Sequence, residues 1–231
     1  MTRRIRIVSW NIRKAVGLDW RRDPARILRV LNRLAADIVI LQEADRRLPP
    51  RPPALPPDSV RAAGWSMIDA DPDTPSIGHH GNAVLLGRVF TLDRLQAIDL
   101  PGLEPRGAVL ARCTGCGGSL TIGALHLGLR HKDRLQQMAH VLRTAEAFEG
   151  PVLLGGDLNE WRPGRSLLPA GSPWRAVLPG PSFHASRPSL RLDRFVVSPD
   201  LIVRDSGVAT RQMAERASDH LPVWIEIEGL A

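Results

Sequence analysis

The amino-acid sequence predicts an α/β protein with mixed β-sheets, and two observations lead to this class. Short apolar segments with the spacing of β-strands recur along the chain, and turns rich in Gly and Pro separate several of them. Two longer segments instead carry apolar residues at helical spacing, and they are interspersed with the strands. This mixed order favours mixed sheets over a purely parallel, doubly wound sheet.

The N-terminal part of the chain supplies two predicted strands and the first helix. Residues 5–12 have the pattern of a strand, and residues 37–41 form a short apolar run typical of a buried strand. Residues 23–35 have helical spacing and begin with Asp23 and Pro24. An aspartate N-cap followed by proline is a common way to begin a helix.

The rest of the chain combines one further helix with many short strands. Residues 133–148 have helical spacing, with an apolar face predicted at Leu135, Met138, Val141, Leu142 and Ala145. The predicted strands are 83–86, 89–95, 107–112, 120–125, 151–154, 191–197, 201–208 and 223–227.

The composition predicts one globular domain that covers residues 1–231. Hydrophobic residues make up 43% of the chain and charged residues 24%, which is typical of a folded protein and not of a disordered one. The three Pro-Pro pairs in residues 46–58 predict a stiff surface loop, too short to separate two domains. Cys113 and Cys116 have no second pair to complete a zinc site, so a hairpin turn is the better interpretation of this motif.

The charge narrows the classes of partner. The chain has 31 Lys+Arg and 24 Asp+Glu, a net charge of +7, and its lysines are Lys14 and Lys132 alone. A basic excess suits nucleic acid, a phospholipid surface or a phosphorylated substrate. No apolar stretch approaches the roughly 20 residues of a membrane-spanning helix, and the N-terminus lacks the apolar region of a signal peptide. We therefore expect a cytoplasmic protein.

Polar residues that can bind metals and transfer protons lie at the ends of six predicted strands. Any one of them has an ordinary interpretation, since polar residues often flank strands. Together they supply carboxylate, amide and imidazole groups, which hold hard divalent cations and move protons. They are Asn11, Glu43, His126, Asp157 with Asn159, Asp193, and Asp219 with His220.

Through these residues and the segments around them, the chain resembles the endonuclease/exonuclease/phosphatase superfamily. This superfamily consists of metal-dependent phosphoesterases with a deoxyribonuclease-I-like fold. The matching segments follow the family's order and extend from residue 9 to residue 222. They are Ser9-Trp10-Asn11, Leu41-Gln42-Glu43, Gly81-Asn82-Ala83, His126-Leu127, Gly155-Gly156-Asp157-Leu158-Asn159, Leu192-Asp193-Arg194 and Ser218-Asp219-His220-Leu221-Pro222. The resemblance implies a four-layer α/β sandwich, in which two packed mixed β-sheets are flanked by helices.

The resemblance also implies a metal site. Glu43 would be the main carboxylate ligand of Mg²⁺, with Mn²⁺ as a substitute, and Asn11 would lie beside it as a carbonyl or water-mediated ligand. Asp219 would lie near the metal as a direct or an outer ligand. A sparse set of this kind suits magnesium, which keeps several of its waters.

The remaining strand-end residues would act on the substrate. By resemblance, Asp157 orients or deprotonates the attacking water, and Asn159 hydrogen-bonds the phosphoryl group. His220 acts with Asp193, whose carboxylate fixes the tautomer of the imidazole. His126 stands where the abasic-site and exonuclease-III-like branch usually has a tyrosine motif, and this chain contains no Tyr. The chain is therefore more similar to the deoxyribonuclease-I, sphingomyelinase and phosphatase-like branches.

Three further residues are weaker candidates for substrate binding. Arg106 could clamp a phosphate with two hydrogen bonds, although a surface arginine near a turn is as good an interpretation. Asn82 could support the metal site or the phosphate, although Gly81-Asn82 is also ordinary turn chemistry. Core packing or loop anchoring is favoured for most of the tryptophans near loops, and Trp161 is the best candidate among them to stack on a base. The pair at residues 79–80, two histidines, lies in a loop with no matching acid spacing, so local roles are favoured.

We expect a Mg²⁺-dependent phosphodiesterase, with DNA or RNA as the first candidate substrate. A phospholipid or a small phosphate ester is the alternative, because the same residues are compatible with it. A catalytically silent binding module is a third hypothesis, and the joint presence of Glu43, Asp157, Asn159, Asp193 and His220 argues against it. We expect a monomer that binds a phosphate ester and has no obligate protein partner.

Overall fold

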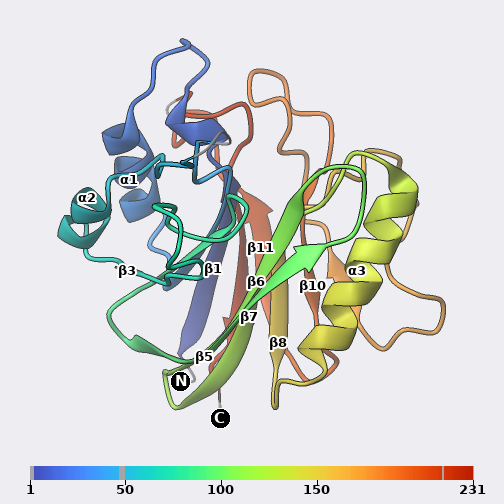
Figure 1. Ribbon diagram of the computed structural model, residues 1–231. Coiled ribbons are helices and arrows are strands. Elements are labelled where there is room, and N and C mark those ends of the chain that lie inside the picture. The colour runs from blue at the N-terminus through green and yellow to red at the C-terminus, as the bar shows by residue number, and fades with distance from the viewer. Residues whose placement is uncertain (1–2, 47–49, 215, 231) are drawn as a thin grey trace.

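Two six-stranded β-sheets pack face to face in the computed structural model, which describes residues 3–46, 50–214 and 216–230 (Figure 1). The first sheet has the strand order β11 (Val203–Val208), β12 (Val223–Glu228), β1 (Arg4–Asn11), β2 (Ile38–Gln42), β4 (Ala83–Leu86) and β3 (Ser66–Met67). The second sheet has the order β5 (Phe90–Leu100), β6 (Arg106–Gly115), β7 (Gly118–His126), β8 (Val152–Asp157), β10 (Asp193–Val197) and β9 (Arg175–Val177).

Among the described strands, each sheet contains one parallel pair, and a helix joins the two strands of that pair. Helix α1 (Pro24–Arg33) connects β1 to β2, and helix α3 (His131–Ala145) connects β7 to β8. A parallel pair needs such a crossover, because the chain must return to the end at which it started. Asn11 pairs with Gln42, and His126 pairs with Asp157. The carboxyl ends of each parallel pair therefore lie side by side.

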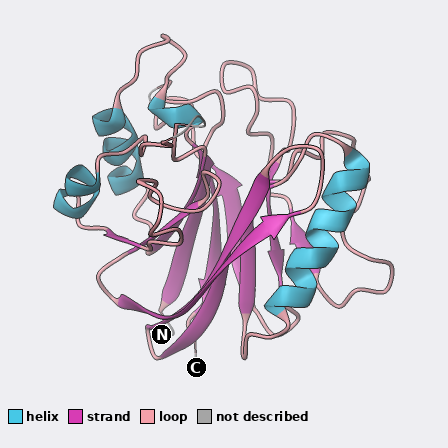
Figure 2. Ribbon diagram, viewed as in Figure 1, coloured by secondary structure: helices cyan, strands magenta, loops and turns pink. Residues whose placement is uncertain are grey.

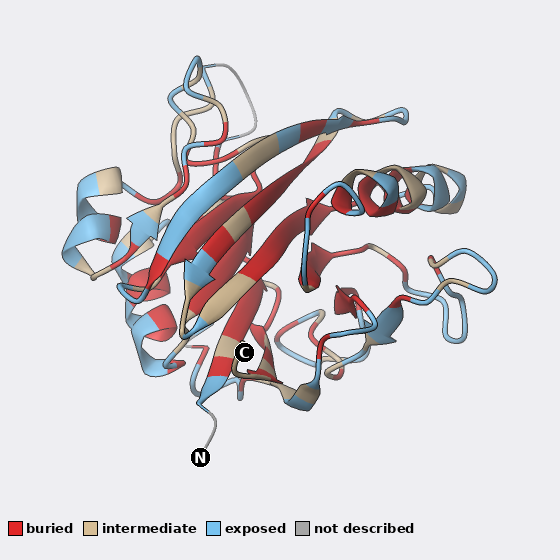
Figure 3. Cartoon of the chain, turned by 90° about the horizontal axis from the view of Figure 1, so that it is seen from below, coloured by how far each residue is buried: buried red, intermediate tan, exposed pale blue. Residues whose placement is uncertain are grey.

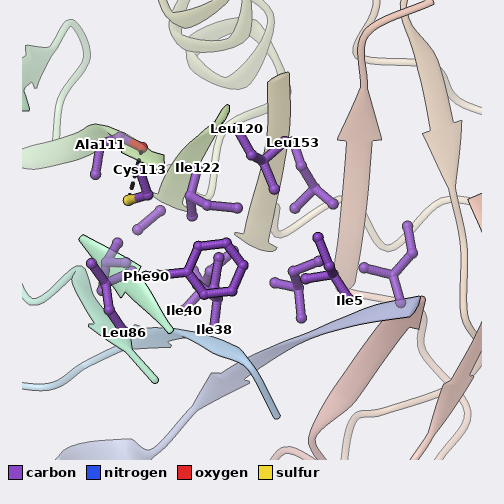
Figure 4. Packing of buried hydrophobic residues seen from close by; sticks show 14 of the residues in the cluster. Ile5, Ile38, Ile40, Leu86, Phe90, Ala111, Cys113, Leu120, Ile122 and Leu153 are labelled. Atoms are coloured by element: carbon purple, nitrogen blue, oxygen red, sulfur yellow. Dashed lines mark hydrogen bonds between the residues drawn. The ribbon is translucent and has the colours of Figure 1, made fainter. Parts of the chain in front are cut away.

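Apolar side chains fill the space between the sheets and cover both outer faces. Between the sheets, Ile5 and Ile38 pack in one cluster with Ile122 and Leu153 (Figure 4). Helices α1 and α2 (Pro57–Ala62) cover the outer face of the first sheet, and α3 covers that of the second (Figure 2). The central strands are buried along most of their length (Figure 3). The predicted four-layer sandwich is confirmed.

The two predicted helices form for the reasons read from the sequence, with one correction. The side chain of Asp23 caps α1 by accepting the Arg26 N–H at 2.9 Å. In α3 the placement of Leu135 on the apolar face was wrong, since it is 40% exposed. Arg134 and Gln137 are buried instead, because their polar ends hydrogen-bond to backbone groups of neighbouring loops. No helix of the described part of the chain is long and apolar enough to cross a membrane.

Short elements account for most of the remaining differences. Helix α2 begins at Pro57, inside the predicted loop 46–58, of which residues 47–49 lie outside the described residues. The pair Pro56-Pro57, which predicted a loop, thus begins a helix. Pro56 is its N-cap and Pro57 its first residue, where a missing N–H has no cost. The 3₁₀ turn η1 (Arg13–Ala15) and the strands β3 and β9 were not predicted. Two or three residues are too few to show a periodicity.

The second sheet has longer strands than predicted, and the hairpin turn predicted at Cys113 and Cys116 is confirmed. The predicted strand 89–95 extends to Leu100 in β5, an edge strand whose exposed positions hide the alternation. Strands β6 and β7 are joined through Cys116 and Gly117, both with positive φ, 54° and 92°. Two central residues with positive φ are what a tight hairpin turn requires.

Gly156 allows the β7–β8 pair to form, and its replacement gives a stability prediction. A Cβ at this position would lie 1.9 Å from the backbone oxygen of Leu125. Because a backbone oxygen cannot turn away, we expect Gly156→Ala to lower the free energy of unfolding by about 2–3 kcal/mol in urea titrations. Gly150→Ala is the control, since Gly150 has a positive φ of 82° but no neighbour within 4 Å, and it should cost about 1 kcal/mol. Equal losses would contradict the steric account.

Candidate active site

The carboxyl ends of the two parallel pairs meet between the sheets and bring their polar residues together. Asn11 ends β1 and Glu43 follows β2, while His126 ends β7 and Asp157 ends β8, at the upper end of the sheets in Figure 1. The side-chain amide of Asn11 donates from Nδ2 to Asp157 Oδ2 at 3.2 Å and lies 3.5 Å from Glu43 Oε1. This amide therefore joins the polar groups of one sheet to those of the other.

Asp157 is the carboxylate on which these contacts converge. It is buried, and its Oδ2 lies 3.5 Å from His126 Nε2 and 3.7 Å from His220 Nε2. Its other oxygen, Oδ1, accepts the backbone N–H of Asn159 at 3.0 Å. The Asn159 side chain in turn donates to the backbone oxygen of Leu127 at 2.8 Å. The turn after β8 thus folds back on Asp157, the last residue of that strand.

His220 is held from behind by a second buried carboxylate. Its Nδ1 lies 2.9 Å from Asp193 Oδ2, which also accepts the hydroxyl of Ser182. The indole N–H of Trp10 fixes the backbone of His220 by donating to its oxygen at 2.9 Å. Burial by itself lowers the pKa of His220, but Asp193 and Asp157 outweigh it and raise this pKa to about 10. The ring is therefore a cation at neutral pH, with Nε2 directed at Asp157.

His126 is neutral, unlike His220, although it faces the same carboxylate. Burial lowers the pKa of its imidazole to about 4, and Arg106 acts in the same direction against Asp157. The ring is therefore neutral at neutral pH. The site thus holds one charged and one neutral imidazole, within 3.7 Å and 3.5 Å of one oxygen of Asp157.

Glu43 carries the negative charge on the first-sheet side of the site. Its carboxylate forms an ion pair with the ammonium group of Lys14. Burial by itself raises the pKa of Glu43, but Lys14 and His126 outweigh it and lower this pKa below its usual value. Lys14 lies within η1, whose residues 13–15 all have positive φ, from 45° to 60°. Such backbone is costly for residues other than glycine and often marks a functional site.

These groups line a pocket of about 530 Å³. The sequence-predicted residues that line it are Asn11, Glu43, Arg106, His126, Asp157, Asn159 and His220. Side chains that the sequence analysis did not assign to the site also line it, among them Lys14, Asp45, Arg51, His80, Leu129, Phe183 and Leu192. The rarity of lysine in this chain was a signal for Lys14. The others come from loops whose paths depend on the whole fold, and no sequence pattern marked them.

Four of the predicted residues lie away from the pocket lining. Asp219 faces Arg13, with 3.6 Å between its Oδ2 and Nε. Asn82 is buried and donates to the backbone oxygen of Gly107 at 2.8 Å. Trp161 is exposed and lines a second pocket of about 610 Å³, whose lining also includes Leu158, the residue before Asn159. Asp193 also lies outside the lining, directly behind His220.

The oxygen donors at the centre of the pocket fit a magnesium ion. The carboxylates of Glu43 and Asp157 supply these donors, and the Asn11 amide nitrogen lies between them, at 3.5 Å and 3.2 Å, while its oxygen accepts the Arg13 N–H at 3.0 Å. Magnesium sites in enzymes commonly use one or two carboxylates and keep several waters, so a set of this size is sufficient. The ammonium group of Lys14 pairs with Glu43, so a cation that binds Glu43 would displace it. The two carboxylates form a donor set that suits a hard divalent cation once Lys14 has moved aside.

A buried ion pair anchors the segment that carries Asn159. Glu160 is fully buried and accepts from Arg134 Nη2 of α3 at 2.8 Å, while His131 lies 2.7 Å from the same oxygen. Its backbone oxygen accepts from Arg194 of β10. The residue after Asn159 is thus fixed to a helix and to a strand, which holds the segment in place.

The chain belongs to the endonuclease/exonuclease/phosphatase family, because the sequence model of this family matches residues 8–220. The uncharacterised protein YbhP of Escherichia coli K12 is 30% identical over 166 residues, which cover 65% of this chain. The match covers 63% of YbhP, so this chain spans less than two thirds of that relative. The same match is found with YbhP of Shigella flexneri.

Solved structures of the family have the same fold at low sequence identity. An endonuclease/exonuclease/phosphatase from Bacteroides vulgatus superimposes with a TM-score of 0.77 at 15% identity, covering 98% of this chain and 99% of that one. The protein from Beutenbergia cavernae gives 0.75 at 23% identity, with 99% and 72% covered. TDP2 of D. rerio, solved with a single-stranded DNA product, gives 0.70 at 19% identity, with 97% and 99% covered.

The anchoring ion pair gives a second stability prediction. We expect Arg134→Met to lower the free energy of unfolding by about 3 kcal/mol, because it leaves the buried Glu160 carboxylate with only His131 and the Arg162 N–H as partners. Arg61→Met removes the exposed ion pair with Asp58 on α2 and should change stability by less than about 1 kcal/mol. Denaturant titration measures both, and a similar small effect in each would show that the buried pair anchors nothing.

Proposed function

We propose that the protein is a divalent-metal-dependent phosphodiesterase, with nucleic acid as its substrate. The observation that supports this most directly is the meeting of Asn11, Glu43, His126, Asp157 and His220 in one pocket between the sheets. Phosphodiester hydrolysis needs a positioned water, positive charge near the phosphoryl oxygens and help for the leaving group. The pocket offers a group for each of these tasks, and membership of the family supports ester hydrolysis.

Glu43 would hold Mg²⁺, or Mn²⁺ in its place, with the Asn11 amide and waters as further ligands. The bound ion would supply positive charge to the phosphoryl group and to the leaving oxygen. Asp219 would serve as an outer ligand, since Arg13 faces its carboxylate.

The other residues of the pocket have roles that follow from their contacts. Asp157 would orient the attacking water and accept its proton, because its Oδ2 lies toward the pocket beside both histidines. Asn159 uses one amide proton on Leu127 and would offer the second to a phosphoryl oxygen. Asp193 would hold the ring of His220 through Nδ1, so that Nε2–H stays beside Asp157 and can reach the phosphate.

His126 and Arg106 would bind the phosphoryl group from the side of the second sheet. Both line the pocket, and Glu104 holds the Arg106 guanidinium with two hydrogen bonds, at 2.7 and 3.1 Å. A guanidinium fixed in this way can present its free N–H groups to an anion at little entropic cost. The placement of the chain near the histidine-type branches, its cytoplasmic location and its monomeric state stay predictions.

The second pocket favours a nucleic acid over a smaller phosphate ester. It adjoins the segment of Asn159 and is lined by four arginines and by the exposed ring of Trp161, over which the Arg162 guanidinium lies at 5.1 Å. Basic grooves with an aromatic side chain suit single-stranded nucleic acid, whose backbone is negative and whose bases stack. A phospholipid or a small phosphate ester remains the alternative and would use the first pocket alone.

The first test of this function is a substrate panel with site variants. Purified protein with Mg²⁺ or Mn²⁺ is assayed on single-stranded DNA, plasmid DNA, RNA, phospholipid vesicles and bis-nitrophenyl phosphate. We expect metal-dependent hydrolysis that EDTA abolishes, and at least about a 100-fold loss of kcat in Asp157→Asn and in His220→Gln.

The controls remove the same chemical groups away from the pocket. Asp58→Asn on α2 and His140→Gln on α3 should leave turnover at the wild-type level. Unchanged hydrolysis in the Asp157 and His220 variants would overturn the site assignment. No turnover on any substrate of the panel would favour a binding module on this fold.

The arginines of the second pocket give a separate prediction about nucleic acid. We expect the double variant Arg162→Gln/Arg165→Gln to raise KM for single-stranded DNA and to lower the slope of log affinity against log salt by about 1–2. Hydrolysis of bis-nitrophenyl phosphate should stay unchanged, because this ester does not reach the second pocket. Arg61→Gln/Arg204→Gln is the matched control for loss of two exposed charges. A proportional loss on both substrates would contradict this role.

A further inference from the structure

Two histidines and an aspartate form a compact cluster at the rim of the first pocket. His79 and His80 precede β4 of the first sheet, and Asp99 lies on β5 of the second sheet. The Nε2 atoms of His79 and His80 lie 3.0 Å and 3.1 Å from the same oxygen, Asp99 Oδ1. The imidazole nitrogens and this oxygen all lie within 4.8 Å of one another. Sequence spacing could not reveal the cluster, because its acid comes from another strand.

The hydrogen bonds of a neutral His79 are incomplete. A neutral His79 that donates from Nε2 to Asp99 keeps a bare lone pair on Nδ1, and this buried atom has no hydrogen-bond partner. Asp71 Oδ2, an acceptor, lies 3.8 Å from it. With the proton on Nδ1 instead, Nε2 would direct its lone pair at the Asp99 carboxylate. A cation between Nε2 and Asp99 resolves this, since Nδ1–H can then donate to Asp71.

We propose that His79, His80 and Asp99 bind a divalent transition-metal ion such as zinc, which joins the two sheets at the rim of the pocket. Two imidazoles and one carboxylate form a ligand set that suits zinc better than magnesium. Tetrahedral zinc with bonds of about 2.0–2.1 Å separates its ligand atoms by about 3.4 Å. The observed 3.0 and 3.1 Å need only a small expansion. A water would be the fourth ligand, because Asp99 faces solvent.

The backbone around the two histidines holds their rings in position. The residue-79 and residue-82 backbones exchange two hydrogen bonds of 2.9 Å, and the Asn82 side chain donates to His79 O and Gly107 O. Both rings pack on Gly107, where a Cβ would lie 2.6 Å from His79 and 2.8 Å from His80. Asn82, predicted as a support of the central site, is thus the support of this cluster.

His80 can act as a ligand once Arg51 moves. Burial lowers the pKa of His80, and His79 and Arg51 act in the same direction, so the ring is neutral at pH 7. Arg51 Nη1 lies 3.3 Å from His80 Nδ1, and a metal on Nε2 would place a proton on that nitrogen. Arg51 would then turn towards Asp45, with which it already interacts. We therefore expect Arg51→Gln to bind the metal more tightly than the wild-type protein.

The test uses cobalt and zinc as probes in a Glu43→Gln background. The proposed central metal site then does not contribute, so a failure of that site cannot be confused with a failure of the cluster. We expect Co²⁺ to give the visible absorption bands of a tetrahedral site, and a Zn²⁺ excess of about 100 times Kd to stabilise the protein by about 2.7 kcal/mol. His79→Gln and Asp99→Asn should abolish both signals. Asp71→Asn should weaken zinc binding by about 10-fold or more, as the loss of an outer hydrogen bond to a ligand does.

Matched controls keep the result specific to the cluster. Asp93→Asn on the same strand and His140→Gln on α3 should keep both signals unchanged. Far-UV circular dichroism shows whether each variant is folded. Absence of both signals in the Glu43→Gln protein, or their survival in folded His79→Gln and Asp99→Asn, would overturn the proposal. The three residues would then be a hydrogen-bonded cluster with a protonated imidazole.

Discussion

The crossover geometry of the two parallel strand pairs is the constraint on which the rest of the molecule depends. Each pair needs a helix to return the chain, so α1 and α3 lie on opposite outer faces and leave the inner faces to pack on each other. The same geometry places the carboxyl ends of β1, β2, β7 and β8 next to one another. Residues that are far apart in sequence, such as Asn11 and Asp157, therefore meet in the gap between the sheets.

The electrostatics of the pocket follow from burying charge in that gap. A carboxylate loses much of its hydration when it is buried, and this loss is tolerable only if fixed partners surround it. Asp157 has such partners in the Asn11 amide, two imidazoles and the Asn159 N–H. The two histidines differ because His220 has a second buried carboxylate behind it and His126 has an arginine in its neighbourhood. One environment thus yields both a charged and a neutral imidazole without a change of residue type.

The sequence carried enough information for the layers and for the centre of the pocket. Strands that pass through the middle are long apolar runs, and their polar last residues, such as Glu43 and Asp157, mark the edge where the chain leaves the core. What it lacked was information on which loops turn inward. Lys14 reaches Glu43 from a 3₁₀ turn with positive φ, and His80 reaches the rim from a turn held by Asn82. Neither path has a local pattern, because tertiary contacts decide it.

The predictions for the apolar face of α3 and for the edge strand β5 were incomplete for a related reason. The apolar spacing of α3 included Leu135, but the loop carbonyls beside this helix need donors, and Arg134 satisfies them while covering the apolar surface with its stem. The spacing of apolar residues reports hydrophobicity alone and gives no information on such unpaired backbone groups. Strand β5 is a second case, because buried and exposed residues alternate only near its end, at Ile98, Asp99 and Leu100.

The two sheets are held together by apolar packing almost everywhere, but at the pocket they are joined by polar contacts. Asn11 and Asp157 form such a contact at the base, and His79 and His80 with Asp99 form another at the rim. Apolar packing tolerates small sliding movements, whereas hydrogen bonds lose strength steeply with distance and angle. The spacing between the sheets is therefore fixed most tightly at the end where the proposed chemistry occurs. A Cβ at Gly155 would lie 2.9 Å from both Ile40 and Phe195 in the core between the sheets. A side chain at this position would therefore push the sheets apart and alter the distance from Asn11 to Asp157 without touching either.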